Sequence, residues 1–383
     1  MSAIAVFTVS TVVIIYVMAG YPLLLALRAR RQCRPVAKGD YEPQISLLIA
    51  VHNGAEFVAA KLRSVLALHY PRQKMEILVA SDGSTDGTNE IVRGFSGDDV
   101  RLLTLPHSGK CAALNAAIDQ ARGEIIVFTD VRQRLDPDSV RLMMRCFADP
   151  AVGVVSGDLR IEKGTSQEEA DIGLYRRMES WIRDRLSWMD SMFGATGSLY
   201  AIRRGLVVRL PEDLLLDDMY MPLEGAFRHG YRCVLEPAAL AYDIPTRREA
   251  EFWRKMRTLA GNYQLWMKCP WLLGPSNRRL FDFLSHKAGR LVLPFLLVAV
   301  ACSSWFLPSP WREPVLAAQA LFYGLALADP ILPRSSVLKG ISSPARTFVV
   351  MMAAAVGGLA IFFVPARRLW KVAGGSTEPE GLS

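Results

Sequence analysis

Long uncharged apolar stretches lie near both ends of the chain. They run from Ala3 to Leu27, from Leu291 to Trp311 and from Thr347 to Ala366. Each is close to the roughly 20 apolar residues that a helix needs to cross a bilayer. A shorter apolar stretch, from Pro314 to Ala328, is a further candidate. The pattern therefore predicts membrane-spanning helices at the N-terminal and C-terminal ends of the chain.

Between these stretches, strand patterns alternate with helical patterns. Helices are expected around Ala55 to Leu68, from Thr88 onward, from Lys110 to Ala121 and from Asp136 to Ala148. The expected strands are ISLLIAV, EILVA, VRLLTL, EIIVFTD, GVVSGDLRI and YRCVLEP. Strands that alternate with helices indicate βαβ units on a parallel sheet, and apolar runs suit a sheet that is buried on both faces. The predicted fold class is α/β, with a mostly parallel, Rossmann-related sheet.

The second half of the central region has longer helical patterns. Helices are expected over Glu168 to Met189 and Asp213 to Arg228, with a glycine-containing loop from Phe193 to Arg204 between them. Arg247 to Trp266 combines a basic face with large aromatic side chains, which suits a helix at the membrane surface. The predicted domains are an anchor at 1–27, a linker at 28–43, an α/β domain at 44–245, an amphipathic interfacial helix at 246–275, membrane segments at 288–366 and a tail at 367–383.

The N-terminal stretch is interpreted as a retained anchor rather than a cleaved signal peptide. No positively charged region precedes it, and it is longer than the roughly 7–15 apolar residues of a signal peptide. Arginines follow it at positions 28, 30, 31 and 34. Because positive charge marks the cytoplasmic side of membrane helices, the domain that follows is expected in the cytosol.

The C-terminal topology is open at this stage. With the α/β domain inside, three C-terminal spans would leave Arg367, Arg368 and Lys371 outside, against the positive-inside rule. Either the stretch Pro314 to Ala328 is re-entrant or interfacial, or the rule fails in this protein. Asp329 and the proline after it favour an incomplete span.

The net charge of +8 arises from 45 Lys and Arg residues against 37 Asp and Glu residues. The excess lies beside the apolar stretches and within Arg247 to Arg257, so we attribute most of it to attraction for anionic lipid headgroups. The chain has no pattern of basic residues interleaved with aromatic residues, so the sequence does not predict nucleic-acid binding. The six cysteines are scattered without CxxC spacing or histidine partners, which fits a reduced cytosolic domain.

Carboxylates follow two of the predicted strands and begin a later helix. EILVA leads to Asp82 and the turn SDGSTDGT, EIIVFT leads to Asp130, and LPEDLLL leads to Asp217 and Asp218. Ligands of open α/β sheets bind at the carboxyl ends of strands. One Asp in such a place is often a turn former or a helix cap, but three such sites in one domain indicate a functional site.

A nucleotide-sugar transferase needs three contributions from side chains. One carboxylate fixes the nucleoside, an acidic site holds a divalent metal ion on the diphosphate, and a base deprotonates the acceptor hydroxyl. Asp82 suits the first of these, Asp130 the second, and the pair Asp217 and Asp218 the third. The chain is therefore interpreted as a membrane enzyme that uses a nucleotide-activated substrate.

Longer motifs extend this interpretation. In chain order they are ISLLIAVHNGAEFVAAKLRSVLALHYP, EILVASDGSTDGT, HSGKCAALNAAIDQARGEIIVFTD, GATGSLYAIRR and LLLDDMYMPLEGAFRHGYR. The ordered set, from about Gln44 to Trp266, resembles the membrane-bound family 2 glycosyltransferases, which include cellulose, chitin, hyaluronan and poly-N-acetylglucosamine synthases. This resemblance implies a GT-A fold and an inverting transfer from a nucleotide sugar, with a UDP-sugar as the expected donor.

The resemblance also implies a set of residues that bind the nucleotide sugar. These are His52, Asn53, Ser81, Asp82, Lys110, Asp130, Arg132 and Arg254. Within the set, Asp82 is expected at the uracil or ribose and Lys110 near the diphosphate. Asp130 matches the first Asp of the family's DxD motif and is the expected ligand of Mg²⁺ or Mn²⁺.

A second set of residues is implied at the transferring end of the site. Asp218, with Asp217 beside it, matches the family's general base, and Arg257 is expected to stabilise the leaving diphosphate electrostatically. The loop from Gly194 to Ser198 matches the segment that shapes the acceptor site. Its expected contributors are Gly194, Thr196 and Gly197.

Two positions depart from the family's motifs. Arg132 stands where DxD has its second Asp, so the metal would have one protein carboxylate, or Arg132 would itself contact the diphosphate. In the QxxRW motif of processive enzymes, Arg254 and Arg257 take the Gln and Arg places, and Thr258 replaces the Trp. Either Trp253 or Trp266 supplies the aromatic platform for the acceptor sugar in its place, or both are interfacial anchors and the enzyme is not processive.

The predicted function is sugar transfer to a polysaccharide or lipid-linked acceptor at the bacterial cytoplasmic membrane. The expected partners are the nucleotide sugar, the acceptor, membrane lipids and subunits of a polysaccharide export complex, without nucleic acid. Thr258 favours an alternative in which one sugar is added to a lipid carrier. A second alternative is a non-catalytic nucleotide-binding membrane partner of an assembly complex, for which Arg132 is the support.

Overall fold

The structure is a computed structural model that describes residues 2–161, 167–244, 248–333, 336–366 and 368–369. Arg247, Arg367, Lys371 and the predicted tail from 370 onward lie outside the described residues. Contacts divide the chain into two compact units. We call them the α/β unit, which is Arg28–Gly164 with Ser180–Pro245, and the helical unit, which is Met1–Leu27 with Thr165–Glu179 and Thr246–Ser383.

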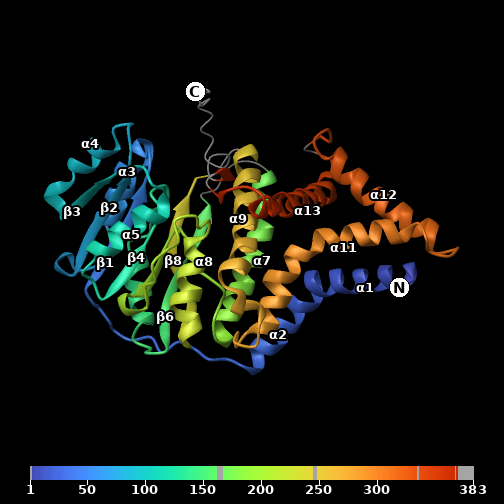
Figure 1. Ribbon diagram of the computed structural model, residues 1–383, viewed down its shortest axis with the longest axis horizontal. Coiled ribbons are helices and arrows are strands. Elements are labelled where there is room, and N and C mark those ends of the chain that lie inside the picture. Colours follow the sequence, from blue (N-terminus) through green and yellow to red (C-terminus); the bar gives the residue numbers. More distant parts are fainter. Residues whose placement is uncertain (1, 162–166, 245–247, 334–335, 367, 370–383) are drawn as a thin grey trace. The chain divides into compact units, whose positions relative to one another are not determined.

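An eight-stranded sheet with the order β3-β2-β1-β4-β7-β6-β8-β5 forms the centre of the α/β unit (Figure 1). The strands are β1 (Ile45–Val51), β2 (Met75–Asp82), β3 (Val100–Leu105), β4 (Ile125–Phe128), β5 (Arg134–Leu135), β6 (Val152–Ile161), β7 (Tyr200–Arg203) and β8 (Arg232–Asp243). β1 pairs in parallel with β2 and β4, β2 with β3, and β6 with β8. β7 is antiparallel to β4 and β6, and β5 to β8. The predicted α/β class is confirmed.

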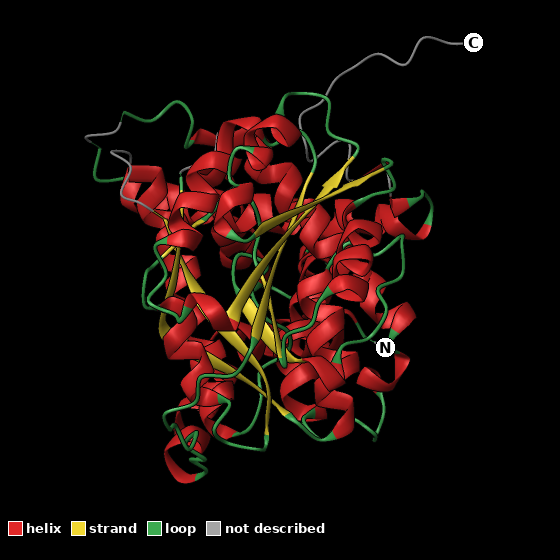
Figure 2. Cartoon of the chain, turned by 90° about the vertical axis from the view of Figure 1, so that its left-hand side faces the viewer, coloured by secondary structure: helices red, strands yellow, loops and turns green. Residues whose placement is uncertain are grey.

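The central parallel strands are buried on both faces, as their apolar runs predicted, whereas β3 at the end of the sheet is mostly half-buried. Every residue of β1 except Ala50 is buried, and β4 is buried throughout. Side chains of these strands join those of α3 (Ala55–Leu66) and α6 (Ser139–Cys146) in one hydrophobic core. In Figure 2 the strands fan out across the sheet, which reflects the twist that adjacent strands adopt.

Two elements of the α/β unit differ from the pattern-based prediction. The predicted loop from Phe193 to Arg204 contains β7, whose Tyr200, Ala201 and Ile202 are buried between β4 and β6. The helix expected from Asp213 starts only with α8 (Asp217–Tyr220). The leucines before it, at 214, 215 and 216, are buried, so this apolar segment packs into the core as irregular chain rather than as a helix.

The carboxyl ends of β1, β2 and β4 lie at one edge of the sheet. The parallel register pairs Val51 of β1 with Ser81 of β2, and Leu48 of β1 with Phe128 of β4. The residues that follow these strands therefore share that edge. α4 (Thr88–Arg93) and α5 (Lys110–Gln120) begin after the turns that leave β2 and β3.

The described residues of the helical unit include three helices that are long and apolar enough to cross a membrane. They are Ala3–Arg31, Leu280–Ser304 and Lys339–Phe362, which confirms membrane-type helices near both ends. The first contains α1 (Ala3–Ile15) and α2 (Tyr21–Arg31), the second α10 (Leu280–Asp282) and α11 (Gly289–Ser304), and the third α13 (Lys339–Gly358). The second starts before the predicted Leu291 and stops at Ser304, because prolines at 308 and 310 follow.

The shorter apolar stretch forms a helix that is not among these three. It is α12 (Arg312–Ala328), with 17 residues. Asp329 follows it and is 1% exposed. Its carboxylate accepts hydrogen bonds from Lys339 at 2.9 Å and from Ser342 at 2.7 Å, both on α13. The acidic end of α12 is therefore tied to the first turn of the last span.

The predicted interfacial segment forms α9 (Arg248–Lys268), and it packs closely against α13. A Cβ atom on Gly358 would lie 2.9 Å from the backbone nitrogen of Ala260, and one on Gly357 would lie 3.0 Å from Met256 Sδ. These two glycines let the helix backbones approach each other, as small residues do between membrane helices. The remaining long helix, α7 (Gln167–Met189), has residues in both units.

Candidate active site

The turns after β1 and β2 bring the predicted His52, Asn53, Ser81 and Asp82 together. Asn53 adopts a left-handed backbone (φ 48°), and its side-chain oxygen accepts the backbone N–H of Thr85 at 2.8 Å. The Ser81 hydroxyl donates to Ser84 Oγ at 2.9 Å. Asn53 and Ser81 thus hold the turn that leaves β2, and Asn is a residue that tolerates the left-handed region.

The Asp82 carboxylate is buried and holds the start of α5. Its Oδ1 accepts the backbone N–H of Ser108 at 2.7 Å, and its Oδ2 accepts that of Gly109 at 2.9 Å. Oδ2 also lies 3.0 Å from Nδ1 of His107. The Asp82 side chain therefore fixes the segment that leads directly into Lys110.

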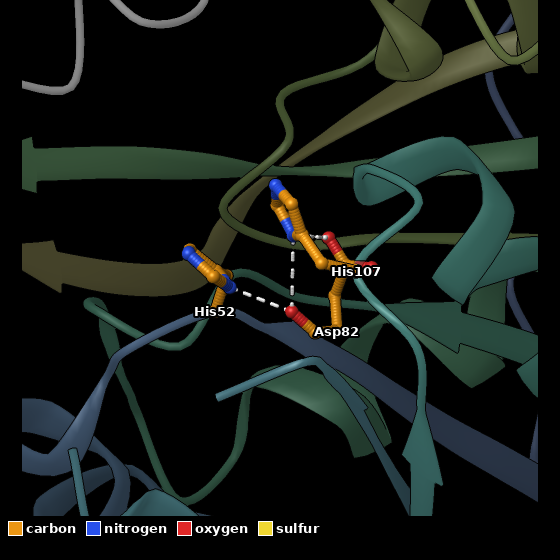
Figure 3. A group of neighbouring side chains, drawn as sticks. All are labelled: His52, Asp82 and His107. Carbon is orange, nitrogen blue, oxygen red and sulfur yellow. Dashed lines mark hydrogen bonds and ion pairs between the residues drawn. The ribbon is translucent and has the colours of Figure 1, made fainter. Parts of the chain in front are cut away.

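Two histidine side chains, His52 and His107, lie beside Asp82 (Figure 3). Nδ1 of His52 lies 2.6 Å from the Asp82 carbonyl oxygen, and the His52 and His107 rings have centroids 4.3 Å apart. The His107 side chain is 63% exposed, so a planar surface of imidazole faces the solvent at this strand edge. Ligand atoms of the three residues lie within 4.8 Å of one another, a spacing that admits a metal ion. The oxygens of Asp82 are, however, already used by backbone N–H groups.

Lys110 joins two of the predicted carboxylates. Its ammonium lies 2.9 Å from Asp130 Oδ1 and 2.9 Å from Asp217 Oδ1. Burial would lower the pKa of Lys110, but the surrounding carboxylates hold it above the ordinary value. The residues expected at the diphosphate, at the metal and beside the general base are thus in direct contact.

The loop from Gly194 to Gly197 wraps around Asp218. The backbone N–H of Ala195 donates to the Asp218 carbonyl oxygen at 2.7 Å, and that of Gly197 donates to Asp218 Oδ2 at 2.9 Å. Gly194 needs its positive φ of 91°, and a Cβ there would lie 2.7 Å from Met219 Cγ. Thr196 donates its backbone N–H to the Ser156 hydroxyl at 3.1 Å.

Gly197 lies between two carboxylates of the site. A Cβ atom at this position would lie 3.3 Å from Asp130 Oδ2 and 3.3 Å from Asp218 Oδ2. The carboxylates that follow β4 and begin α8 therefore face the same small space, which is open because residue 197 has no side chain. This is the strongest geometric evidence for a common site.

The surroundings of Asp218 raise the pKa of its carboxyl group. Burial and the neighbouring Asp217 and Asp130 raise its pKa to about 6, while Lys110 and the N–H of Gly197 oppose the shift. Three carboxylates face one ammonium in this cluster, which leaves an excess of two negative charges. A group with these surroundings suits a general base near neutral pH.

Arg132 contacts the end of β8 rather than the carboxylate cluster. Arg132 Nε is 2.8 Å from Asp243, which is at the end of β8, and its terminal nitrogen donates to the Ile244 carbonyl oxygen at 2.6 Å. Arg254 and Arg257 are on α9 and belong to the helical unit. The other predicted site residues belong to the α/β unit, and the roles of Arg254 and Arg257 stay predictions.

Two residues near the site carried no role in the sequence analysis. His107 lies directly before the SGK segment, and nothing in its spacing indicated that it would stack on His52. Lys61 on α3 lies three residues after the buried Val58 and four before the buried Val65. A charge on the apolar stripe of a helix is a signal that sequence alone contains.

Comparison with known families agrees with this geometry. Residues 46–210 match the family model for Glycosyl transferase family 2. The chain contains a glycosyl transferase family 2 domain. The matched region runs from Ser46 of β1 through β7 and includes the α/β-unit residues that the sequence predicts to bind the nucleotide sugar, while Asp217 and Asp218 lie beyond it. The predicted enzyme class, a glycosyltransferase, is confirmed.

Relatives of known name are similar over part of the chain. The probable glycosyltransferase YdaM of Bacillus subtilis is 26% identical over 239 residues, which is 59% of this chain and 57% of that protein. A poly-beta-1,6-N-acetyl-D-glucosamine synthase of Staphylococcus epidermidis is 38% identical over 125 residues, 32% of this chain and 30% of that protein. The chain thus matches between 30% and 57% of the length of these two curated relatives.

A solved structure shares the fold over almost the whole chain. The mannosyltransferase PcManGT from Pyrobaculum calidifontis, in complex with GDP-Man and Mn²⁺, superposes with a TM-score of 0.74 and 24% identity. The match covers 94% of this chain and 99% of that one. The predicted GT-A fold is confirmed.

Proposed function

We propose that the protein is an inverting membrane glycosyltransferase that moves a sugar from a nucleotide sugar, expected to be a UDP-sugar, to an acceptor hydroxyl. The observation that carries this proposal is the convergence of Asp130 and Asp218 on the space beside Gly197. A donor held at Asp130 would present its reacting carbon to the residue that deprotonates the acceptor. The relatives named as poly-beta-1,6-N-acetyl-D-glucosamine synthases support a polysaccharide acceptor, and a lipid-linked acceptor is part of the proposal.

The donor site fits a divalent cation. Asp130 offers a hard oxygen ligand, and the excess of two negative charges around it favours a cation. Asp130 would hold Mg²⁺ or Mn²⁺ together with phosphate oxygens and water, since Arg132 is engaged with Asp243. The bound metal would offset the charge of the departing diphosphate. We assign His52, Asp82 and His107 to the nucleoside end rather than to this metal.

In the transfer step, Asp218 accepts the proton of the acceptor hydroxyl. The acceptor oxygen then forms a bond to the anomeric carbon, while the bond from that carbon to the diphosphate oxygen breaks. The nucleoside diphosphate leaves with that electron pair, and attack from the opposite face inverts the anomeric configuration. Lys110 lies at the diphosphate end, where its ammonium would stabilise the developing negative charge, and Arg257 is proposed to assist from α9.

The membrane setting is part of the proposal. Three apolar helices suit an integral membrane protein, and we infer a bacterial cytoplasmic membrane with the α/β unit in the cytosol, where nucleotide sugars are made. The arginines at the end of the first helix, at 28, 30 and 31, support that orientation. Partner subunits of an export complex would accept a polysaccharide product.

The test uses the full chain in detergent or nanodiscs, stripped of metal and then supplied with Mg²⁺ or Mn²⁺. A panel of UDP- and GDP-sugars is offered with a membrane lipid extract, and nucleotide release and product size are measured. Metal-dependent release that requires the extract supports the proposal. Nucleotide binding without turnover in any metal would instead indicate the non-catalytic membrane partner.

Thr258 favours the addition of a single sugar as the second candidate function. Threonine has no ring on which a sugar could stack, and the Thr258 hydroxyl donates to the Arg254 carbonyl oxygen at 2.9 Å within α9. Sizing the product separates the two candidates. A ladder of long oligomers indicates a synthase, and one lipid-linked sugar indicates single addition.

The transfer rate should depend on pH through Asp218. A base must be ionised to accept a proton, and the pKa of Asp218 is raised to about 6. We expect kcat/KM to fall about tenfold per unit as the pH drops below that value, and to level off above it. The measurement is a pH profile at limiting donor concentration. A profile that stays flat through this range would contradict the assignment of Asp218.

A further inference from the structure

A buried lysine lies beneath the turn that carries Asp130. Lys61, on α3, is 1% exposed. Its Nζ lies 2.5 Å from the Thr129 hydroxyl and 2.7 Å from the Gln133 carbonyl oxygen. Burying a lysine costs free energy unless its polar head is hydrogen-bonded, so these two contacts determine where the side chain sits. Lys61 therefore contacts the turn on both sides of Asp130, at Thr129 and at Gln133.

Thr129 extends this contact to the loop around Asp218. Its hydroxyl is 2.6 Å from the Ser198 carbonyl oxygen. A carbonyl oxygen only accepts hydrogen bonds, so Thr129 donates to Ser198 and must accept from Lys61. The order Lys61 to Thr129 to Ser198 is thus fixed in direction. Thr129 directly precedes Asp130, and Ser198 directly follows Gly197.

We propose that Lys61 is a positioning residue that sets the distance between the donor-binding carboxylate and the general base. It acts through Thr129 on Asp130 at one end, and through Ser198 and the N–H of Gly197 on Asp218 at the other. Small errors in the distance between reacting groups reduce rates strongly. The proposal rests on the proposed function for the roles of the two carboxylates, while the hydrogen-bond chain itself does not.

The hydrogen bonds that Lys61 donates do not depend on its protonation state. Burial lowers its pKa to about 7, and the charge of Asp130 opposes that shift. A neutral amine retains two N–H groups, so Lys61 donates to both Thr129 and Gln133 in either form. The chain of hydrogen bonds is therefore present across the working pH range.

The test compares isosteric variants of the full chain. Lys61→Met and Thr129→Val each break the chain while preserving side-chain volume, and Thr129→Ser keeps the hydroxyl. We expect the first two to lower kcat for transfer by about 100-fold, with little change in the KM for the donor. Thr129→Ser should restore most of the rate. Thr104→Val, on an exposed position of β3, controls for the loss of a hydroxyl elsewhere.

Amide hydrogen exchange in the absence of substrate gives a readout that needs no activity. Lys61→Met and Thr129→Val should accelerate exchange at residues 197–199 and 130–133, with unchanged protection in β2 as the check of folding. Unchanged exchange at residues 197–199 in both variants would overturn the coupling. If the unaltered protein turns over no nucleotide sugar but the exchange changes appear, the proposed function fails and the coupling stands.

Discussion

Replacing Asp218 with Asn is expected to abolish sugar transfer while leaving donor binding intact. The Asn oxygen can still accept the N–H of Gly197, so the loop should keep its conformation. An amide cannot take a proton from the acceptor, and loss of a general base typically costs about 10²–10⁴ in rate. Removing one negative charge from the cluster should leave donor affinity equal or higher, because Asp217 and Asp130 remain. The measurement is kcat for transfer beside calorimetric binding of the nucleotide sugar.

The matched control for this variant is Asp119→Asn. Asp119 is on α5, is 60% exposed and pairs loosely with Arg209 at 3.6 Å, so its change should leave both rate and affinity unaltered. Turnover of Asp218→Asn equal to that of the unaltered protein would remove Asp218 from the role of base. If Asp218→Asn lost both donor binding and turnover, Asp218 would belong to the donor site instead.

Gly197→Ala is expected to inactivate the enzyme without unfolding it. Gly197 has no left-handed backbone, so alanine can adopt its conformation. The added Cβ would meet Asp130 Oδ2 and Asp218 Oδ2 at 3.3 Å each, closer than nearly all carbon contacts in proteins. It would push apart the two groups that must hold the donor and the acceptor, and such a displacement costs on the order of 100-fold in rate.

Gly205→Ala provides the comparison for that variant. A Cβ on Gly205 meets nothing within 4 Å, and its backbone is also outside the left-handed region. Both variants should therefore melt at similar temperatures, while only Gly197→Ala loses transfer. Normal transfer by Gly197→Ala would show that the space between the two carboxylates is not where the reaction occurs.

The positions of Asp82 and Asp130 could be predicted from the sequence because their causes are local. An apolar run forms a buried strand, and the residue after it comes to the edge of the sheet where ligands bind. The apolar helices were predictable for the same reason, since their length and composition decide them. Their ends differ from the prediction, because the second span begins at Leu280 and includes polar residues from Asp282 to Arg290, and because prolines follow Ser304.

The contacts that define the site could not be predicted in this way. Gly197 separates the carboxylates of Asp130 and Asp218 only because β7 inserts beside β4, and β7 was interpreted as a loop on account of its glycine-rich approach. The pairing of Arg132 with Asp243 joins residues more than a hundred positions apart. Such contacts depend on how the whole sheet closes, and no periodicity in a single sequence encodes them.

The bridge from Lys110 to Asp130 and Asp217 has a consequence for the turnover of product. On the proposed mechanism, Lys110 contacts the diphosphate while a nucleotide is bound. When the nucleotide leaves, the Lys110 ammonium can pair again with Asp130 and Asp217, which lie 2.9 Å from it in this structure. Asp130 and Asp217 thus compete with the nucleoside diphosphate product for the Lys110 ammonium. A cation without such neighbours would retain the nucleoside diphosphate more tightly, and each cycle would end more slowly.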